Sequence, residues 1–148
     1  MSKNLKVFLG IVCFFNLICK CEKECESVNF IENTKNNIKG FSFLNNKIMP
    51  HNINFKMDNY IYEHGELTDF YTHPFAIEFG IGKHDSYIID RKNLFLTITK
   101  IGKSNSNLKQ RLFKCKKIID NSIFIKEFSE LIKIQQKQFN IITDKNKL

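Results

Sequence analysis

Residues 74–101, PFAIEFGIGKHDSYIIDRKNLFLTITKI, carry the clearest structural pattern in the chain. Apolar side chains occupy alternate positions in two runs of this stretch, namely Phe75, Ile77, Phe79 and Ile81, and then Leu94, Leu96 and Ile98. Turn-forming residues separate the extended runs at 82–85 and 90–93. Because such alternation places apolar side chains on one face of a strand, the stretch predicts an antiparallel β-meander.

Further strand patterns flank this meander. Residues 52–57 alternate cleanly, residues 60–62 combine aromatic and β-branched side chains, and residues 41–44 form a weaker candidate. Pro50 separates the candidates at 41–44 and 52–57, and we expect it to divide two strands. After a polar loop, residues 111–119 continue as a strand that brings Cys115 into the sheet.

A helical period replaces the strand period from Ser122 onward. The apolar positions that fall on one helical face are Phe124, Ile125, Phe128, Leu131, Ile132 and Phe139. Asp120, Asn121 and Ser122 are all favourable N-cap residues. We therefore predict an α+β fold, in which a mainly antiparallel β-sheet of about six strands, arranged as a sandwich or half-barrel, is covered by one C-terminal amphipathic helix.

Composition limits the classes of protein to which the chain can belong. Its 148 residues suffice for one ordinary domain, and 43% hydrophobic residues are far too many for a disordered chain. The formal net charge is +8, but only Arg91 and Arg111 among the 23 basic residues carry the guanidinium that reads bases and phosphates. A nucleic-acid partner is therefore not expected.

The N-terminus has the pattern of a secretory signal peptide. Two lysines precede residues 7–19, VFLGIVCFFNLIC, which are almost wholly apolar. This run is shorter than the roughly 20 residues of a membrane span, so no span is expected after signal cleavage. We predict a signal peptide at 1–21 with the cut after Cys21, a polar extended arm at 22–40, and a single β-rich domain with its C-terminal helix at 41–148. A buried core helix is the alternative for the apolar run.

The cysteines suggest one disulfide in the exported chain. Removal of the predicted signal takes away Cys13, Cys19 and Cys21, which leaves Cys25 and Cys115 as a pair. Free thiols are one alternative, and a metal or redox cluster of Cys19, Cys21 and Cys25 is another. The C-x-C and C-x3-C spacings of such a cluster match neither a thioredoxin motif nor a paired zinc knuckle.

A loop rich in histidine and acids is the candidate metal site. Its possible ligands are His64, Glu66, Asp69 and His73, the residue types that zinc or non-haem iron accepts. Their spacing matches no known metal motif, so a solvated loop is the simpler interpretation. The chain also lacks a nucleophile elbow, a P-loop and a dinucleotide fingerprint. We expect no cofactor and no catalytic residue.

Two aromatic or basic stretches are the candidate binding surfaces. The residues that we expect to make contacts are Tyr60, Tyr62, Tyr71, Arg111, Lys114 and Lys116. Lysines on a strand also discourage pairing between molecules, which is the ordinary alternative for the basic stretch. The hypothesis is a small secreted, non-catalytic binding protein whose partner is a protein or an anionic glycan or lipid headgroup. The alternatives are a metal-binding protein or small hydrolase, and a lumenal thiol-redox or folding factor.

Overall fold

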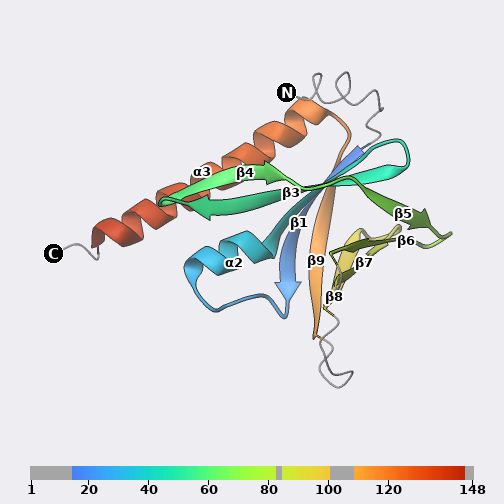
Figure 1. The fold of residues 1–148 in the computed structure, drawn as a ribbon, viewed down its shortest axis with the longest axis horizontal. Coiled ribbons are helices and arrows are strands. Elements are labelled where there is room, and N and C mark those ends of the chain that lie inside the picture. Colours follow the sequence, from blue (N-terminus) through green and yellow to red (C-terminus); the bar gives the residue numbers. More distant parts are fainter. Residues whose placement is uncertain (1–14, 83–84, 101–108, 146–148) are drawn as a thin grey trace.

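The computed structural model describes residues 15–82, 85–100 and 109–145, which form nine strands and two helices (Figure 1). The strands are β1 (Phe15–Lys23), β2 (Ile38–Phe43), β3 (Lys47–Lys56), β4 (Asn59–His64), β5 (Thr68–Thr72), β6 (Ala76–Ile81), β7 (Asp85–Asp90), β8 (Phe95–Lys100) and β9 (Lys109–Ile118). The helices are α2 (Phe30–Asn37) and α3 (Asn121–Lys145).

Eight of the strands close an antiparallel β-barrel. The order around the barrel is β2-β1-β9-β8-β7-β6-β5-β3, and a further pairing between β2 and β3 completes the circle. The extra strand, β4, forms a hairpin with β3 that lies along α3 (Figure 1). The α+β class is confirmed, but the arrangement is a barrel of eight strands rather than a sandwich or half-barrel of about six. Two pairings that the barrel needs, β1 with β9 and β3 with β5, join strands that are not consecutive in the chain.

The meander predicted at 74–101 forms β6, β7 and β8, and the strand predicted at 111–119 forms β9. Each of these strands is paired antiparallel with the next. Ile77, Phe79, Leu96 and Ile98 all face the interior of the barrel, as their alternation predicts. Phe75 precedes β6 and is 83% exposed, so it does not belong to this face.

The interior of the barrel is filled with side chains. Its buried residues are Leu17, Cys19, Phe41, Phe43, Ile48, Phe79, Tyr87, Ile89, Leu96, Ile98, Phe113 and Cys115. Phe41 packs edge-on against Phe79, with ring centroids 5.4 Å apart. An eight-stranded barrel is just wide enough for such side chains to fill, so its interior is a core.

Strand β1 comes from the segment that the sequence assigns to a signal peptide. It lies between β2 and β9, and its Leu17 and Cys19 are fully buried in the barrel. The predicted cleavage point after Cys21 falls inside this strand. The periodicity of a short apolar run cannot distinguish a signal peptide from a buried strand. For this reason the sequence pattern alone favoured a signal peptide. The rest of the predicted signal, residues 1–14, lies outside the described residues.

The described residues form two disulfides, neither of which is the predicted pair of Cys25 and Cys115. Cys19 lies directly opposite Cys115 in the β1–β9 register and is bonded to it. Cys21 is bonded to Cys25, four residues later. The prediction removed Cys19 and Cys21 with the signal, so their pairings could not be considered.

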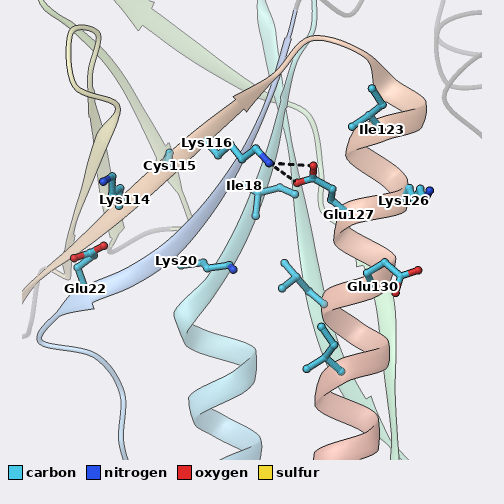
Figure 2. Close-up of a pocket in the computed structure, with 12 residues that line it drawn as sticks. Ile18, Lys20, Glu22, Lys114, Cys115, Lys116, Ile123, Lys126, Glu127 and Glu130 are labelled. Atoms are coloured by element: carbon cyan, nitrogen blue, oxygen red, sulfur yellow. Dashed lines mark hydrogen bonds and ion pairs between the residues drawn. The ribbon is translucent and has the colours of Figure 1, made fainter.

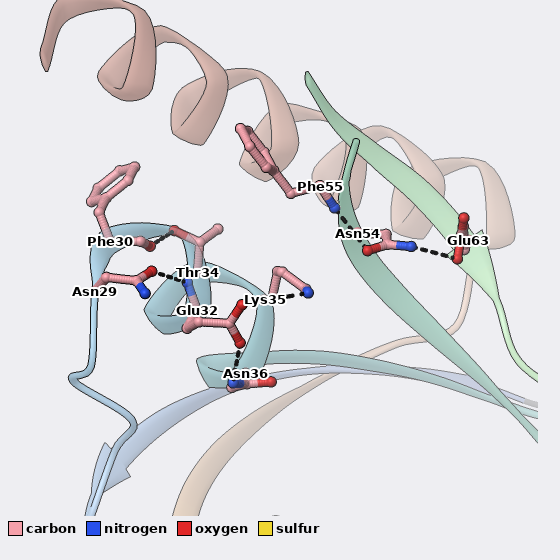
Figure 3. A network of polar contacts seen from close by, with 9 residues as sticks. All are labelled: Asn29, Phe30, Glu32, Thr34, Lys35, Asn36, Asn54, Phe55 and Glu63. Carbon is pink, nitrogen blue, oxygen red and sulfur yellow. Dashed lines mark hydrogen bonds and ion pairs between the residues drawn. The ribbon is translucent and has the colours of Figure 1, made fainter. Parts of the chain in front are cut away.

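Helix α2 occupies much of the segment 22–40, which we predicted to be an extended arm. Asn29 caps the helix, because its Oδ1 accepts a hydrogen bond of 2.8 Å from the Glu32 backbone N–H. Thr34 Oγ1 donates to the Phe30 carbonyl within the same helix (Figure 3). An Asn followed three residues later by Glu is a helix-start signal, which the sequence analysis did not use.

Strand β3 runs through Pro50, where the sequence predicts a break. Residues 47 and 48 pair with β5, and residues 51–56 pair with β4 on that same side. The Pro50 carbonyl accepts a hydrogen bond from Gly65 between these two neighbours. The missing N–H of proline therefore falls where β3 changes partners, and the strand continues.

Helix α3 covers the outside of the barrel. The Asp120 carboxylate caps it by accepting hydrogen bonds from the Ser122 and Ile123 backbone N–H groups. The face predicted from the sequence packs on outward-pointing side chains of the barrel and hairpin, including Ile18, Ile53 and Tyr60. Within residues 15–82, 85–100 and 109–145, neither helix combines the length and apolarity needed to cross a bilayer.

Candidate functional site

A groove of about 660 Å³ separates α3 from the outer face of β1 and β9 (Figure 2). Its lining residues are Ile18, Lys20, Glu22, Lys114, Cys115, Lys116, Ile123, Lys126, Glu127, Glu130, Leu131 and Ile134. This volume is typical of a ligand site on a protein of ordinary size. The groove is the candidate functional site.

Strand geometry decides which side chains of β1 and β9 face this groove. Cys19 and Cys115 point into the barrel, so the residues directly before and after each of them point outward. Lys20 therefore shares the outer face with Lys114 and Lys116. A one-residue change in register would have buried these lysines in the core.

Helix α3 supplies an apolar wall. Its residues Ile123, Leu131 and Ile134 line the groove at helical spacing. Ile123 and Ile134 are 50% and 49% exposed, although the same helix buries Phe124 and Phe128 against the barrel. The groove thus leaves branched apolar side chains in contact with solvent beside a row of lysines.

One lysine of the groove is neutralised by the helix. Lys116 Nζ donates to both carboxylate oxygens of Glu127, at 3.1 and 3.2 Å, and this ion pair crosses from β9 to α3 (Figure 2). Glu130 lies 3.9 Å from Lys133 on the same helix. Both acidic groups of the α3 wall therefore have a cationic neighbour.

Lys20 and Lys114 lie directly opposite each other on β1 and β9. Side chains in this relation have Cβ atoms about 5 Å apart, and like charges placed so close destabilise a sheet. Neither ammonium group forms an ion pair with any residue in the part of the chain that the structure describes. Glu22 is the nearest acid in sequence on the same face of β1.

Arg111, predicted to act with Lys114 and Lys116, lies elsewhere. It has the inward parity of Phe113, and its guanidinium lies 5.3 Å from the centroid of that ring. It also donates a hydrogen bond of 2.8 Å to the Asn36 carbonyl. Burial lowers the pKa of Lys39 to about 8, and the positive charge of Arg111 is the second cause.

The three predicted tyrosines do not form one surface. Tyr60 is only 5% exposed and packs between Phe55 and Phe139. Tyr62 is partly exposed, and Tyr71 is 67% exposed on β5. None of the three lines the groove.

The predicted metal ligands are also dispersed. Lys47 forms an ion pair with Asp69, and His73 Nε2 lies 3.3 Å from Glu78. His64 and Glu66 are exposed at and after the end of β4. No three His, Cys, Asp or Glu side chains come together as a possible metal site among the described residues.

A buried polar chain under α3 was missed by the sequence analysis. His51 Nδ1 contacts the Tyr62 hydroxyl, His51 Nε2 lies 2.6 Å from Ser42 Oγ, and Ser42 Oγ donates to Asn16 Oδ1. Asn16 Nδ2 then donates to Asn121 Oδ1 at 2.7 Å. These residues come from separate elements and are brought together only by the tertiary fold. No local sequence motif could therefore predict this polar chain.

The middle of this polar chain is shielded from solvent, whereas Tyr62 at its end is partly exposed. Ser42 and His51 are 1% and 3% exposed, and His51 packs against Phe124 and Phe128. Burial lowers the pKa of His51 to about 3 and raises that of Tyr62 to about 12, so both are neutral at pH 7. Ser42 lies on β2 and His51 on β3, so this Ser–His contact joins two barrel strands. The polar chain reaches α3 through the Asn16–Asn121 hydrogen bond.

Comparisons with known proteins add no relative from which a function could be carried over. The chain matches no protein-family model, no curated protein and no solved structure.

Proposed function

We propose that this protein is an exported, non-catalytic binding protein whose partner occupies the groove between α3 and the β1–β9 face. The observation that carries the proposal is the opposed pair of Lys20 and Lys114, beside an apolar wall that remains half exposed. Like-charge pairing of this kind costs stability in the free protein. An anionic partner would relieve that cost.

The chemistry of the groove favours binding over catalysis. Its ionisable side chains are lysines and glutamates, and Cys115 is held in a disulfide. Nucleophilic catalysis needs a nucleophile beside an oriented base. Among the described residues that line the groove, none is a histidine, serine or free thiol.

Export is consistent with the two disulfides, which suit an oxidising compartment. A cut after Cys21 would remove most of β1 together with two half-cystines, so we place cleavage upstream of Phe15. The exported chain then retains Lys20, and with it the lysine pair of the groove. The groove itself depends on this earlier cut.

The test is native mass spectrometry of the protein secreted by cells that express the full chain. We expect a bound mass on the wild-type protein, and its loss in Ile134→Trp, which fills the groove. Ile141→Trp is the matched control, because Ile141 is similarly exposed on α3 but does not line the groove. Retention of the protein in the cytosol, or equal bound mass on all three proteins, would contradict the proposal.

A further inference from the structure

We infer that the ligand of the groove is a free, single-chain anionic amphiphile, with its carboxylate held between Lys20 and Lys114 and its chain lying along Ile18, Leu131 and Ile134. This inference rests on the proposed function and names the chemical class of the ligand. It follows from the positions of charge and apolar surface within one groove.

The lysine pair selects the headgroup. In the free protein the exposed Lys20 side chain extends toward α3, whereas the exposed Lys114 side chain extends away from it (Figure 2). Because the two residues are opposed in the β1–β9 register, both ammonium groups can turn toward one carboxylate and donate to it, and such charge-assisted hydrogen bonds are the stronger kind. Lys116 is engaged by Glu127, and Glu22 is the single acid beside the pair on the strand side. The strand side therefore keeps an excess positive charge at Lys20 and Lys114.

The wall of α3 selects an apolar chain. Ile134 is half exposed and Leu131 is partly exposed on α3, and the nearly buried Ile18 adds an apolar contact from β1. Covering these side chains removes apolar surface from water, which stabilises a complex by about 25 cal/mol per Å². A small hydrophilic anion would leave this surface exposed.

The shape of the groove favours a single chain over a membrane surface or a peptide. The site is a recess between a helix and the barrel, and the Lys116–Glu127 ion pair crosses it on the side of Ile123 (Figure 2). A bilayer presents a broad surface that cannot enter such a recess. An extended acidic peptide would have to pass the ion pair, whereas a ligand with one head and one tail ends before it.

The experiment measures oleate binding to the oxidised full chain by isothermal titration calorimetry, below the concentration at which oleate forms micelles. We expect saturable binding to one site, and a loss of affinity of about tenfold or more in K20Q/K114Q. The control is K92Q/K137Q, which changes net charge equally at exposed lysines outside the groove. Its affinity should equal that of the wild-type protein.

Further probes distinguish a free amphiphile from other ligands that carry negative charge or an apolar chain. Oleyl alcohol has the tail without the carboxylate, and hexaglutamate has carboxylates without the tail, so each should bind at least about tenfold more weakly than oleate. Phosphatidylserine vesicles should capture no protein. No oleate binding, equal binding by K20Q/K114Q, competition by hexaglutamate at oleate's affinity, or capture by the vesicles would each overturn the inference.

Failure of this inference can be distinguished from failure of the proposed function. If the secreted protein carries a mass that Ile134→Trp removes but oleate does not displace, the groove binds a ligand of another class. If Ile134→Trp carries the same mass as the wild-type protein, the groove is not the binding site.

Discussion

The interior of the barrel and the layer between the barrel and α3 are built by different physical means. The interior is almost wholly apolar, and one disulfide joins two of its neighbouring strands. The outer layer combines apolar packing with a buried polar chain and an open groove. The interior fixes the fold, whereas the outer layer leaves an open groove lined by lysines and by half-exposed isoleucines.

The disulfide in the interior should have the largest effect on stability. Cys19 and Cys115 are 96 residues apart, and closing a loop of that length is worth about 4 to 5 kcal/mol of unfolding free energy. The Cys21–Cys25 bond closes only four residues and should be worth about 2 kcal/mol. Guanidinium unfolding of C19A/C115A and C21A/C25A measures both losses. Equal losses would contradict this difference between the regions.

The outer layer should be the part of the molecule that is sensitive to acid. His51 takes up a proton at pH 6.5 in the unfolded chain but only near pH 3 in the folded protein. Its contribution to stability is therefore complete above pH 6.5 and is lost as the pH falls. The expected loss approaches about 1.4 kcal/mol per pH unit well below pH 6.5 and amounts to about 2 kcal/mol between pH 6.5 and 4.5.

Unfolding free energies measured from pH 7 to 4.5 test this expectation. His51→Gln is the informative variant, because it removes the titrating ring and keeps a polar side chain. The unfolding free energy of this variant should fall less steeply with decreasing pH. The difference in slope should be about 1.4 kcal/mol per pH unit, which corresponds to one proton. An unchanged slope would show that other groups cause the acid sensitivity.

The polar chain should also respond to the loss of a single hydroxyl. Ser42→Ala leaves His51 Nε2 and Asn16 Oδ1 without their contact in a buried site. Unsatisfied buried polar groups cost about 1 to 3 kcal/mol, so we expect a loss of about 2 kcal/mol in chemical unfolding. A neutral result would mean that the chain does not join α3 to the barrel.

The smallest expected effect has the opposite sign. K20Q/K114Q removes the opposed charges on β1 and β9 and should stabilise the free protein by about 0.5 kcal/mol. A shift of the thermal unfolding midpoint at low salt, which diminishes at high salt, is the measurement. If the variant is less stable than the wild-type protein, the opposed lysines do not lower the stability of the free protein, and a ligand would have no such repulsion to relieve.

The parts of the fold that sequence reasoning predicts are those with a strong local period. The apolar residues of β6 and β8 repeat every two residues, and those of α3 repeat with a helical period over many turns. Barrel closure could not be predicted, because β1 pairs with β9 across most of the chain. The short apolar run in β1 fits a signal peptide and a buried strand equally well.

Sequence analysis predicted only part of the candidate site. Lys114 and Lys116 were named from the basic stretch, and both line the groove. Lys20 was assigned to a leader, and its position opposite Lys114 follows only from the long-range register. The sequence around Lys20 contains no signal that predicts pairing with Lys114, and the sequence around Lys114 contains none that predicts pairing with Lys20. Sequence alone therefore cannot predict this contact.

Retention of β1 in the natural protein is the central claim of this account. Intact mass measurement with disulfide mapping of the secreted protein tests it most directly. The account predicts a chain that contains residues 15–21, with Cys19 linked to Cys115 and Cys21 linked to Cys25. A chain that begins at Glu22, with Cys25 linked to Cys115, would contradict both the barrel and its groove.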